Sequence, residues 1–130
     1  MIEVNNLTKD RIADGFLKNI ARKVLAKEPA SLQKKAQDLS IALVKKEEIR
    51  KLNVKYRQKD KPTDVLSFSY GSSGEVVICP DIVKENAKKY RNVFKEELAR
   101  VLIHGILHIL GYNHREMADK PARYIKIFLK

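Results

Sequence analysis

The chain has 130 residues, with 27 lysines and arginines against 16 aspartates and glutamates, a formal net charge of +11. This length fits one domain over residues 1–130, and 44% apolar residues exclude a disordered or fibrous chain. The single cysteine, Cys79, excludes an intramolecular disulfide and fits a reducing compartment. The N-terminus lacks a signal-peptide pattern, and no apolar run is long enough to cross a bilayer. We therefore expect a cytoplasmic protein with a basic surface and no membrane partner.

The first third of the chain predicts a strand, a helix and a second strand. Residues 1–6 alternate as in a short strand. Thr8 is a candidate N-cap for a long amphipathic helix, which should end at Glu28-Pro29 because a residue before proline leaves the helical region. Residues 39–44 form an aliphatic run that indicates a strand buried on both faces.

The rest of the chain predicts a helix, a hairpin and three more helices. In order, these are a charged helix over 46–54, hairpin strands over 64–70 and 75–79, and helices over 81–91, 94–110 and 117–128. The clearest turn signal is Gly71-Ser72-Ser73-Gly74, and Pro80 suits the first turn of a helix. Strands and helices mix without strict alternation, so we predict an α+β fold with one small mixed sheet.

All three histidines, His104, His108 and His114, lie within an 11-residue stretch. His104 and His108 are four residues apart on a predicted helix, so both rings project from one face. Gly111 ends that helix and permits a left-handed backbone, which lets His114 return toward the same point. Chance clustering of solvated histidines is the alternative, but a third histidine after a glycine turn favours a metal site. Three imidazoles with an open fourth position are typical of catalytic zinc.

The surroundings of the histidines refine this prediction. Glu97, Arg100, His104 and His108 share a polar stripe opposite an apolar face, as expected for a helix that lines a cleft. The spacing of the histidines matches zinc proteases, but Gly105 stands where those enzymes carry their general-base glutamate. The motif thus favours a metal and disfavours peptide hydrolysis. Cys79 ends an apolar strand and is expected to be a buried thiol rather than a ligand.

A basic segment, residues 45–61, holds eight basic and three acidic residues and so carries +5. With Tyr56 among these charges, the segment could hold a nucleic-acid backbone and stack a base, although a merely solvated surface is the alternative. The neighbouring Thr63-Asp64 pair fits either turn chemistry or a site role.

Two blocks of this sequence resemble the YbeY family of metal-dependent endoribonucleases. The first block is His104-Gly105-x-Leu107-His108-x-x-Gly111-Tyr112-x-His114. The second comprises Asn53, Tyr56-Arg57, Pro62-Thr63-Asp64-Val65-Leu66-Ser67-Phe68 and Gly74-Glu75-Val76-Val77-Ile78. The blocks follow the family's order, and the predicted elements fit the family over nearly the whole chain.

The resemblance implies a mixed four-stranded sheet surrounded by helices, with one Zn²⁺ per chain held by His104, His108 and His114. It implies that Arg57 is the basic residue of the active cleft. It further implies a single-strand-specific endoribonuclease of 16S rRNA 3′-end maturation and ribosome quality control. The expected partners are rRNA precursors, the small ribosomal subunit and ribosomal proteins, but not DNA.

Some residues depart from the family pattern. Asn113 replaces an acidic residue before the third histidine, Ser69 replaces a proline, and the loop at 71–74 is short. The general base is left unassigned, and the 2′-hydroxyl of RNA could instead be the nucleophile. Two alternative functions stay open: a ribosome-assembly factor with a structural metal, and a zinc hydrolase of another substrate.

Overall fold

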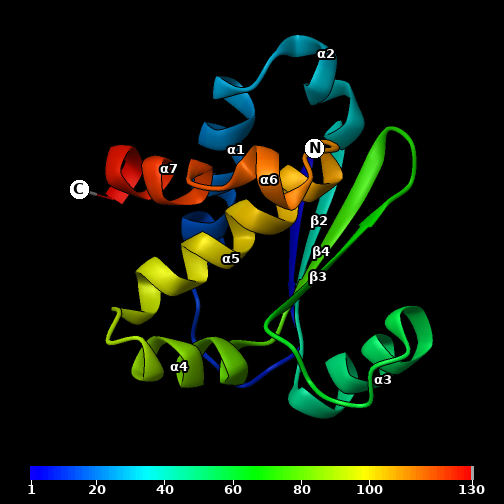
Figure 1. Ribbon diagram of the computed structural model, residues 1–130, viewed down its shortest axis with the longest axis vertical. Helices are drawn as coiled ribbons and strands as arrows, with labels where there is room; N and C mark the ends of the chain where they lie inside the picture. Colours follow the sequence, from blue (N-terminus) through cyan, green and yellow to red (C-terminus); the bar gives the residue numbers. More distant parts are fainter. Residues whose placement is uncertain (130) are drawn as a thin grey trace.

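A four-stranded sheet forms the centre of the computed structural model, which describes residues 1–129 (Figure 1). Its strands are β1 (Ile2–Asn6), β2 (Asp38–Leu43), β3 (Val65–Ser69) and β4 (Ser73–Ile78). Their spatial order is β1-β2-β4-β3, with β1, β2 and β4 parallel and β3 antiparallel to β4 at one edge. The mixed sheet and its helices confirm the predicted α+β class.

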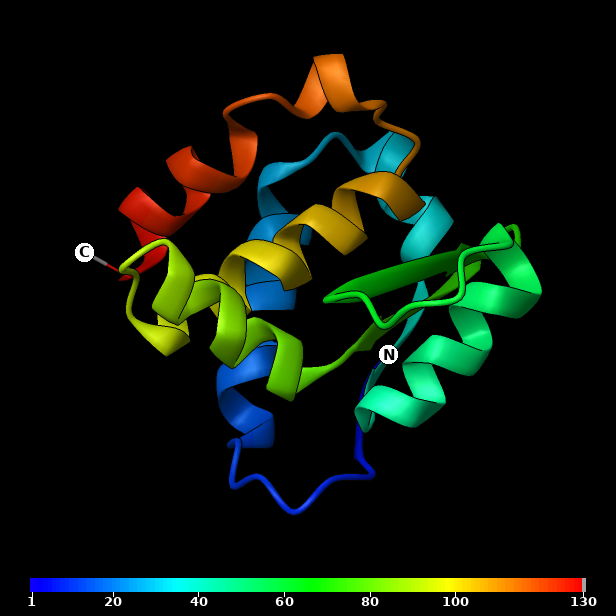
Figure 2. The same ribbon diagram turned by 60° about the horizontal axis from the view of Figure 1, so that its bottom comes forward.

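Helices cover the sheet unequally on its two faces (Figure 2). They are α1 (Asp14–Lys27), α2 (Ala30–Gln33), the 3₁₀ helix η1 (Lys34–Ala36), α3 (Lys46–Arg57), α4 (Pro80–Lys89), α5 (Phe94–Ile109), α6 (His114–Met117) and α7 (Lys120–Leu129). Helix α5 packs against β3 and β4 on one face and against α1, α4 and α7 on its other sides. Among residues 1–129, no helix is both long and apolar enough to span a membrane.

Strand alternation divides the apolar residues into two layers. Ile41 and Val76 point toward α5 and belong to the larger core, while Ala42 and Val77 point to the other face and pack with Ile49 of α3. Helix α3 covers only part of that second face. The N-terminal part of β2 is therefore buried on one face only, and the expectation of a strand buried on both faces holds for its second half.

The predicted start of the first helix was wrong. Helix α1 begins at Asp14 with Ala13 at the N-cap, and Thr8 belongs to a turn that follows β1. The carboxamide oxygen of Asn6 accepts hydrogen bonds from the Thr8 backbone N–H and hydroxyl, at 2.9 and 2.6 Å. Thr8 is held in these local hydrogen bonds, so its side chain does not cap a helix. The predicted end was correct, because Glu28 is extended before Pro29.

Other parts of the helical structure also differ from the prediction. No sequence pattern indicated α2 and η1, and the last helix begins at Lys120, three residues after Met117. Met117 itself ends the short α6 and is buried, as core packing requires. Glu97 does not lie on a solvated stripe, since it is 1% exposed and accepts hydrogen bonds from Arg100 and Asn92.

Helix α5 approaches the sheet most closely at Gly105. A Cβ atom at this position would lie 2.8 Å from Cγ1 of Val76 and 3.4 Å from Cγ2 of Val65. Valine is stiff at χ1, so the sheet cannot easily give way. The position that holds a glutamate in zinc proteases is thus restricted here to a residue without a side chain.

We predict that Gly105→Ala destabilises the protein relative to Gly15→Ala. An added Cβ at Gly15 in α1 meets nothing within 4 Å, so both variants gain helix propensity but only one is overpacked. The free energies of unfolding of the two variants should differ by about 1–3 kcal/mol, the usual cost of overpacking a core. Urea denaturation of both variants measures this difference. Equal stability would show that α5 can move away from the sheet without cost.

Candidate metal centre

The side chains of His104, His108 and His114 converge at one end of α5. Their ligand nitrogens all lie within 4.8 Å of one another. The Nε2 atoms of His104 and His108 are 3.1 Å apart, and the ring centroid of His114 is 4.9 Å from that of His108. The structure thus brings together the three residues that the sequence singled out.

Two local motifs fix the turn at residues 111–113, the histidine turn, which brings His114 back toward His104 and His108. Gly111 has φ of +100°, in the left-handed region. Its N–H bonds to the His108 carbonyl at 3.0 Å, and the Tyr112 N–H bonds to the Leu107 carbonyl at 3.1 Å, which together form a Schellman motif. Asn113 then caps α6 in a capping box with Glu116. The side chain of Asn113 is therefore used in capping, and His114 is the first residue of the new helix.

Burial favours the neutral, metal-binding form of two histidines. His104 and His108 are half-buried, and burial lowers the pKa of both imidazoles below the ordinary value. The imidazoles of His108 and His114 lower the pKa of His104 further. The His114 imidazole and the Arg57 guanidinium likewise lower the pKa of His108. A metal ion needs the unprotonated nitrogens that these conditions supply.

The donor set fits zinc. Tetrahedral ligands with Zn–N bonds of about 2.0–2.1 Å lie roughly 3.3 Å apart, close to the 3.1 Å between the two Nε2 atoms. Within residues 1–129, no fourth histidine, cysteine or carboxylate joins this group. Cys79 packs in the apolar layer beneath α3, and burial raises the pKa of its thiol. The predicted buried thiol is confirmed, and among the described residues Cys79 does not join the histidine group.

The histidines line a hollow of about 290 Å³ between α5 and the edge strand β3. Its other lining residues are Arg57, Thr63, Asp64, Val65, Leu66, Ser67 and Gly105. Asp64 contributes the one carboxylate among the described lining residues, so the Thr63-Asp64 pair does lie at the site. Ser67 was not predicted, although alternation along β3 places it on the same face as Val65, toward α5.

Arg57 lies at the C-terminal end of α3 and reaches the rim of this hollow. Among residues 1–129, no acidic group forms an ion pair with it, whereas Arg50 is held by both Glu47 and Asp60. Helix α3 is joined to the loop before β3 by Asn53, whose buried side chain donates to the Lys61 carbonyl at 2.8 Å. The guanidinium of Arg57 is therefore available to an anion beside the histidines.

Tyr56, the neighbouring aromatic residue, is 52% exposed. Its ring packs edge-on against Phe68, with 5.0 Å between centroids. A base-stacking role for Tyr56 stays a prediction.

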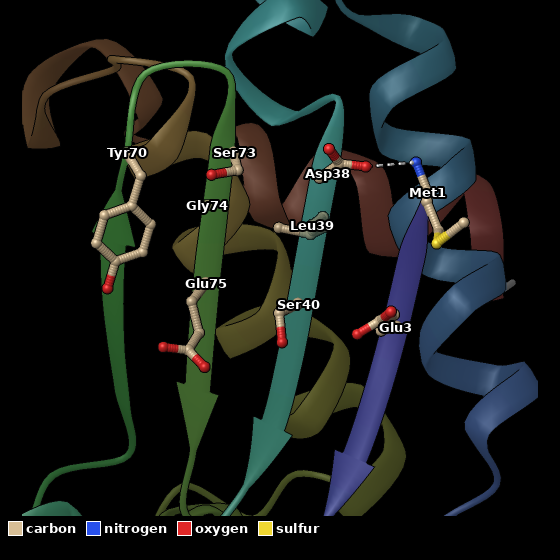
Figure 3. A pocket seen from close by; sticks show the side chains of 9 residues that line it. All are labelled: Met1, Glu3, Asp38, Leu39, Ser40, Tyr70, Ser73, Gly74 and Glu75. Atoms are coloured by element: carbon tan, nitrogen blue, oxygen red, sulfur yellow. Dashed lines mark ion pairs between the residues drawn. The ribbon is translucent and has the colours of Figure 1, made fainter.

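A second hollow, of about 320 Å³, lies on the part of the opposite sheet face that α3 leaves bare (Figure 3). Figure 3 shows the carboxylates of Glu3 and Glu75 on this face. The Asp38 carboxylate forms an ion pair with the Met1 ammonium, at 3.6 Å. Three carboxylates repel a phosphate backbone, although one is partly compensated by the chain terminus. An anionic ligand is therefore expected at the histidine hollow and not here.

The chain is similar to proteins that are already known. The family model described as Endoribonuclease YbeY matches residues 3–123. The chain belongs to this family. Every residue considered above for the histidine hollow falls within the matched stretch.

Curated relatives and a solved structure support the assignment. The chain is 38% identical over 127 residues to Endoribonuclease YbeY of Thermotoga petrophila, covering 88% of this chain and 85% of that protein. It is 39% identical to the Aliarcobacter butzleri protein of the same name, over 88% and 79% of the two chains. For the Thermotoga neapolitana protein, 49% identity spans 65% of this chain and 57% of the relative. The solution structure of a Thermotoga maritima protein, 36% identical, superposes with a TM-score of 0.64 and covers 97% of this chain and 87% of that one.

The lowered pKa values predict how a bound metal responds to acid. Protons compete with the metal for the imidazoles, and His104 and His108 stay neutral to a lower pH than exposed histidines of pKa 6.5. Zinc should therefore stay bound at pH 6.5 and leave only at lower pH. Equilibrium dialysis with zinc analysis across pH 4.5–7.5 measures this, with His108→Ala as the non-binding control. A release midpoint at or above pH 6.5 would contradict the prediction.

Proposed function

We propose that this protein is a zinc-dependent endoribonuclease that cleaves single-stranded RNA. One observation carries the proposal: three histidines converge beside Arg57 in an open hollow, in a chain that belongs to the family described as Endoribonuclease YbeY. RNA is an anionic substrate, and the chain carries a net charge of +11.

The finer assignment follows the family resemblance. We propose that the substrate is an rRNA precursor in the small ribosomal subunit, with roles in 16S rRNA 3′-end maturation and ribosome quality control in the cytoplasm. Ribosomal proteins are proposed as further partners.

His104, His108 and His114 would hold one Zn²⁺. When bound, the metal would supply a water with pKa near 7 and polarise a phosphoryl oxygen. The Arg57 guanidinium would bind the scissile phosphodiester and neutralise the charge that develops in the transition state. Because Gly105 offers no general base, we assign proton acceptance to Asp64, the carboxylate in the same hollow.

The alternative, an assembly factor with a purely structural metal, is less well supported. Structural zinc sites usually have four protein ligands and are closed. Among the described residues only three ligands converge here, and they line an open hollow.

Arg57→Ala should lower the saturated cleavage rate by about 100-fold or more, because it removes a charge directed at the transition state. Arg57→Lys should restore only part of the rate, since an ammonium lacks the two-pronged geometry of guanidinium. Lys51→Ala, in the same basic segment but away from the hollow, is the matched control. It should weaken binding and reduce the slope of log affinity against log salt by roughly 0.7.

Single-turnover cleavage of a labelled single-stranded RNA, with zinc content checked for each variant, separates these effects. If Arg57→Ala weakens RNA binding like Lys51→Ala and leaves the saturated rate unchanged, Arg57 is a binding residue and its catalytic assignment is withdrawn.

Asp64→Asn should keep zinc bound and RNA affinity within about threefold, but lower the saturated rate by about 100-fold, the usual contribution of a general base. The amide has nearly the shape of the carboxylate and cannot accept the proton. Zinc content and RNA affinity, measured on the same preparations, show whether the variant differs in the chemical step alone. An unchanged saturated rate would remove Asp64 from the mechanism.

A further inference from the structure

Glu28 is a buried acidic residue that the proposed reaction does not use. It follows α1, directly before Pro29, and it is 4% exposed. Burying a carboxylate costs several kcal/mol unless other groups compensate its charge. A glutamate in such a place calls for a structural or functional reason.

Three donors compensate the Glu28 carboxylate. Its Oε1 accepts a hydrogen bond of 2.5 Å from the Tyr112 hydroxyl. Its Oε2 accepts from the Tyr124 hydroxyl and lies 3.2 Å from Nζ of Lys120. Burial alone would raise the pKa of Glu28, but these hydrogen bonds outweigh it and hold the pKa below the ordinary value. The carboxylate is therefore charged at neutral pH and connects α1 with the C-terminal third of the chain.

One of these donors belongs to the histidine turn. Tyr112 lies between Gly111 and Asn113, two residues before His114. Its backbone N–H is held by the Leu107 carbonyl at 3.1 Å, and its hydroxyl by Glu28 at 2.5 Å. Lys120 adds a further contact, with Nζ 4.8 Å from the centre of the Tyr112 ring. Tyr112 is thus held by hydrogen bonds at both its backbone and the end of its side chain.

His114 depends on this support more than the other two histidines do. His104 and His108 are held by a long helix that packs on the sheet, whereas His114 is exposed and starts a four-residue helix. Among residues 1–129, no hydrogen bond to the His114 side chain holds its ring. Its ring lies 4.9 Å from that of His108 and 5.7 Å from that of His104, so its position depends on these ring contacts and on the backbone between Gly111 and Asn113.

We propose that Glu28 is a positioning residue, which holds His114 in place for the metal through Tyr112. This inference rests on the metal site of the proposed function. A free His114 would have to be ordered at the moment of binding, and that entropy cost would weaken the metal complex. The Glu28 cluster, which is Glu28 with Tyr112, Tyr124 and Lys120, avoids this cost because it orders the turn before the metal binds.

Tyr112→Phe and Tyr124→Phe make a matched pair, because each removes one hydroxyl that donates to Glu28. Only Tyr112 is part of the histidine turn. We expect Tyr112→Phe to weaken zinc binding roughly tenfold, as losses of outer support for a metal site do. Tyr124→Phe should change the affinity less than about threefold, with a similar or larger fall in Tm. Zinc affinity is measured by competition with a chromogenic chelator, and circular dichroism checks the fold of each variant.

The cobalt-substituted proteins give a second readout. Visible absorption of Co²⁺ reports ligand geometry, and it should change in Tyr112→Phe and stay unchanged in Tyr124→Phe. Glu28→Gln removes the charge and replaces one acceptor oxygen by a donating amide, so the side chain can no longer accept from both tyrosine hydroxyls. It should weaken zinc binding as Tyr112→Phe does, and it serves as the test variant if Tyr112→Phe does not fold.

The outcomes separate this inference from the proposed function. If wild-type protein binds no zinc at this site, the metal centre itself is refuted and the inference falls with it. If wild-type protein binds zinc and the two tyrosine variants bind it equally well, with equal cobalt spectra, Glu28 only stabilises the fold. The positioning role is then refuted while the metal centre stands.

Discussion

The close contact between α5 and the sheet at Gly105 determines how the rest of the site is arranged. Because Gly105 has no side chain, the helix can lie directly on β3 and β4, with Val76 filling the place that a Cβ atom would need. His104 and His108, on either side of this contact, are then carried over the edge strand, where Val65 and Ser67 complete the hollow. The same contact that places two of the three histidines also excludes a protease-type glutamate. The close approach of the α5 backbone to the sheet thus determines both how the helix packs and which side chains can line the hollow.

Charge is distributed in a way that supports an anionic substrate at this edge. In the basic segment, Arg50 and Lys46 are already paired with acidic side chains. Arg57 is not paired within the described chain and stands at the hollow. The carboxylates of Glu3 and Glu75 lie on the other face of the sheet. Attraction for phosphate is therefore expected to be strongest next to the histidines, since exposed charges further away than about 10 Å are largely screened.

Local patterns predicted the site better than they predicted its supports. The four-residue spacing of His104 and His108 and the turn at Gly111 depend on helix geometry alone, so the sequence was enough to place them. The start of α1 was missed because Thr8 bonds to Asn6, a competition between neighbours that periodicity does not show. The Glu28 cluster could not be predicted at all. Its hydrogen bonds join residues 84 and 96 positions apart, and only the folded chain brings them together.

In the proposed function, three imidazoles bind one zinc ion and leave a position open for water. X-ray absorption of the zinc-loaded wild-type protein tests this arrangement most directly. We predict a first shell of nitrogen and oxygen atoms at about 2.0–2.1 Å, with the outer scattering of three imidazoles and one further light atom. A sulfur shell at about 2.3 Å would mean that Cys79 binds the metal. That result, or a shell without imidazole scattering, would contradict the account.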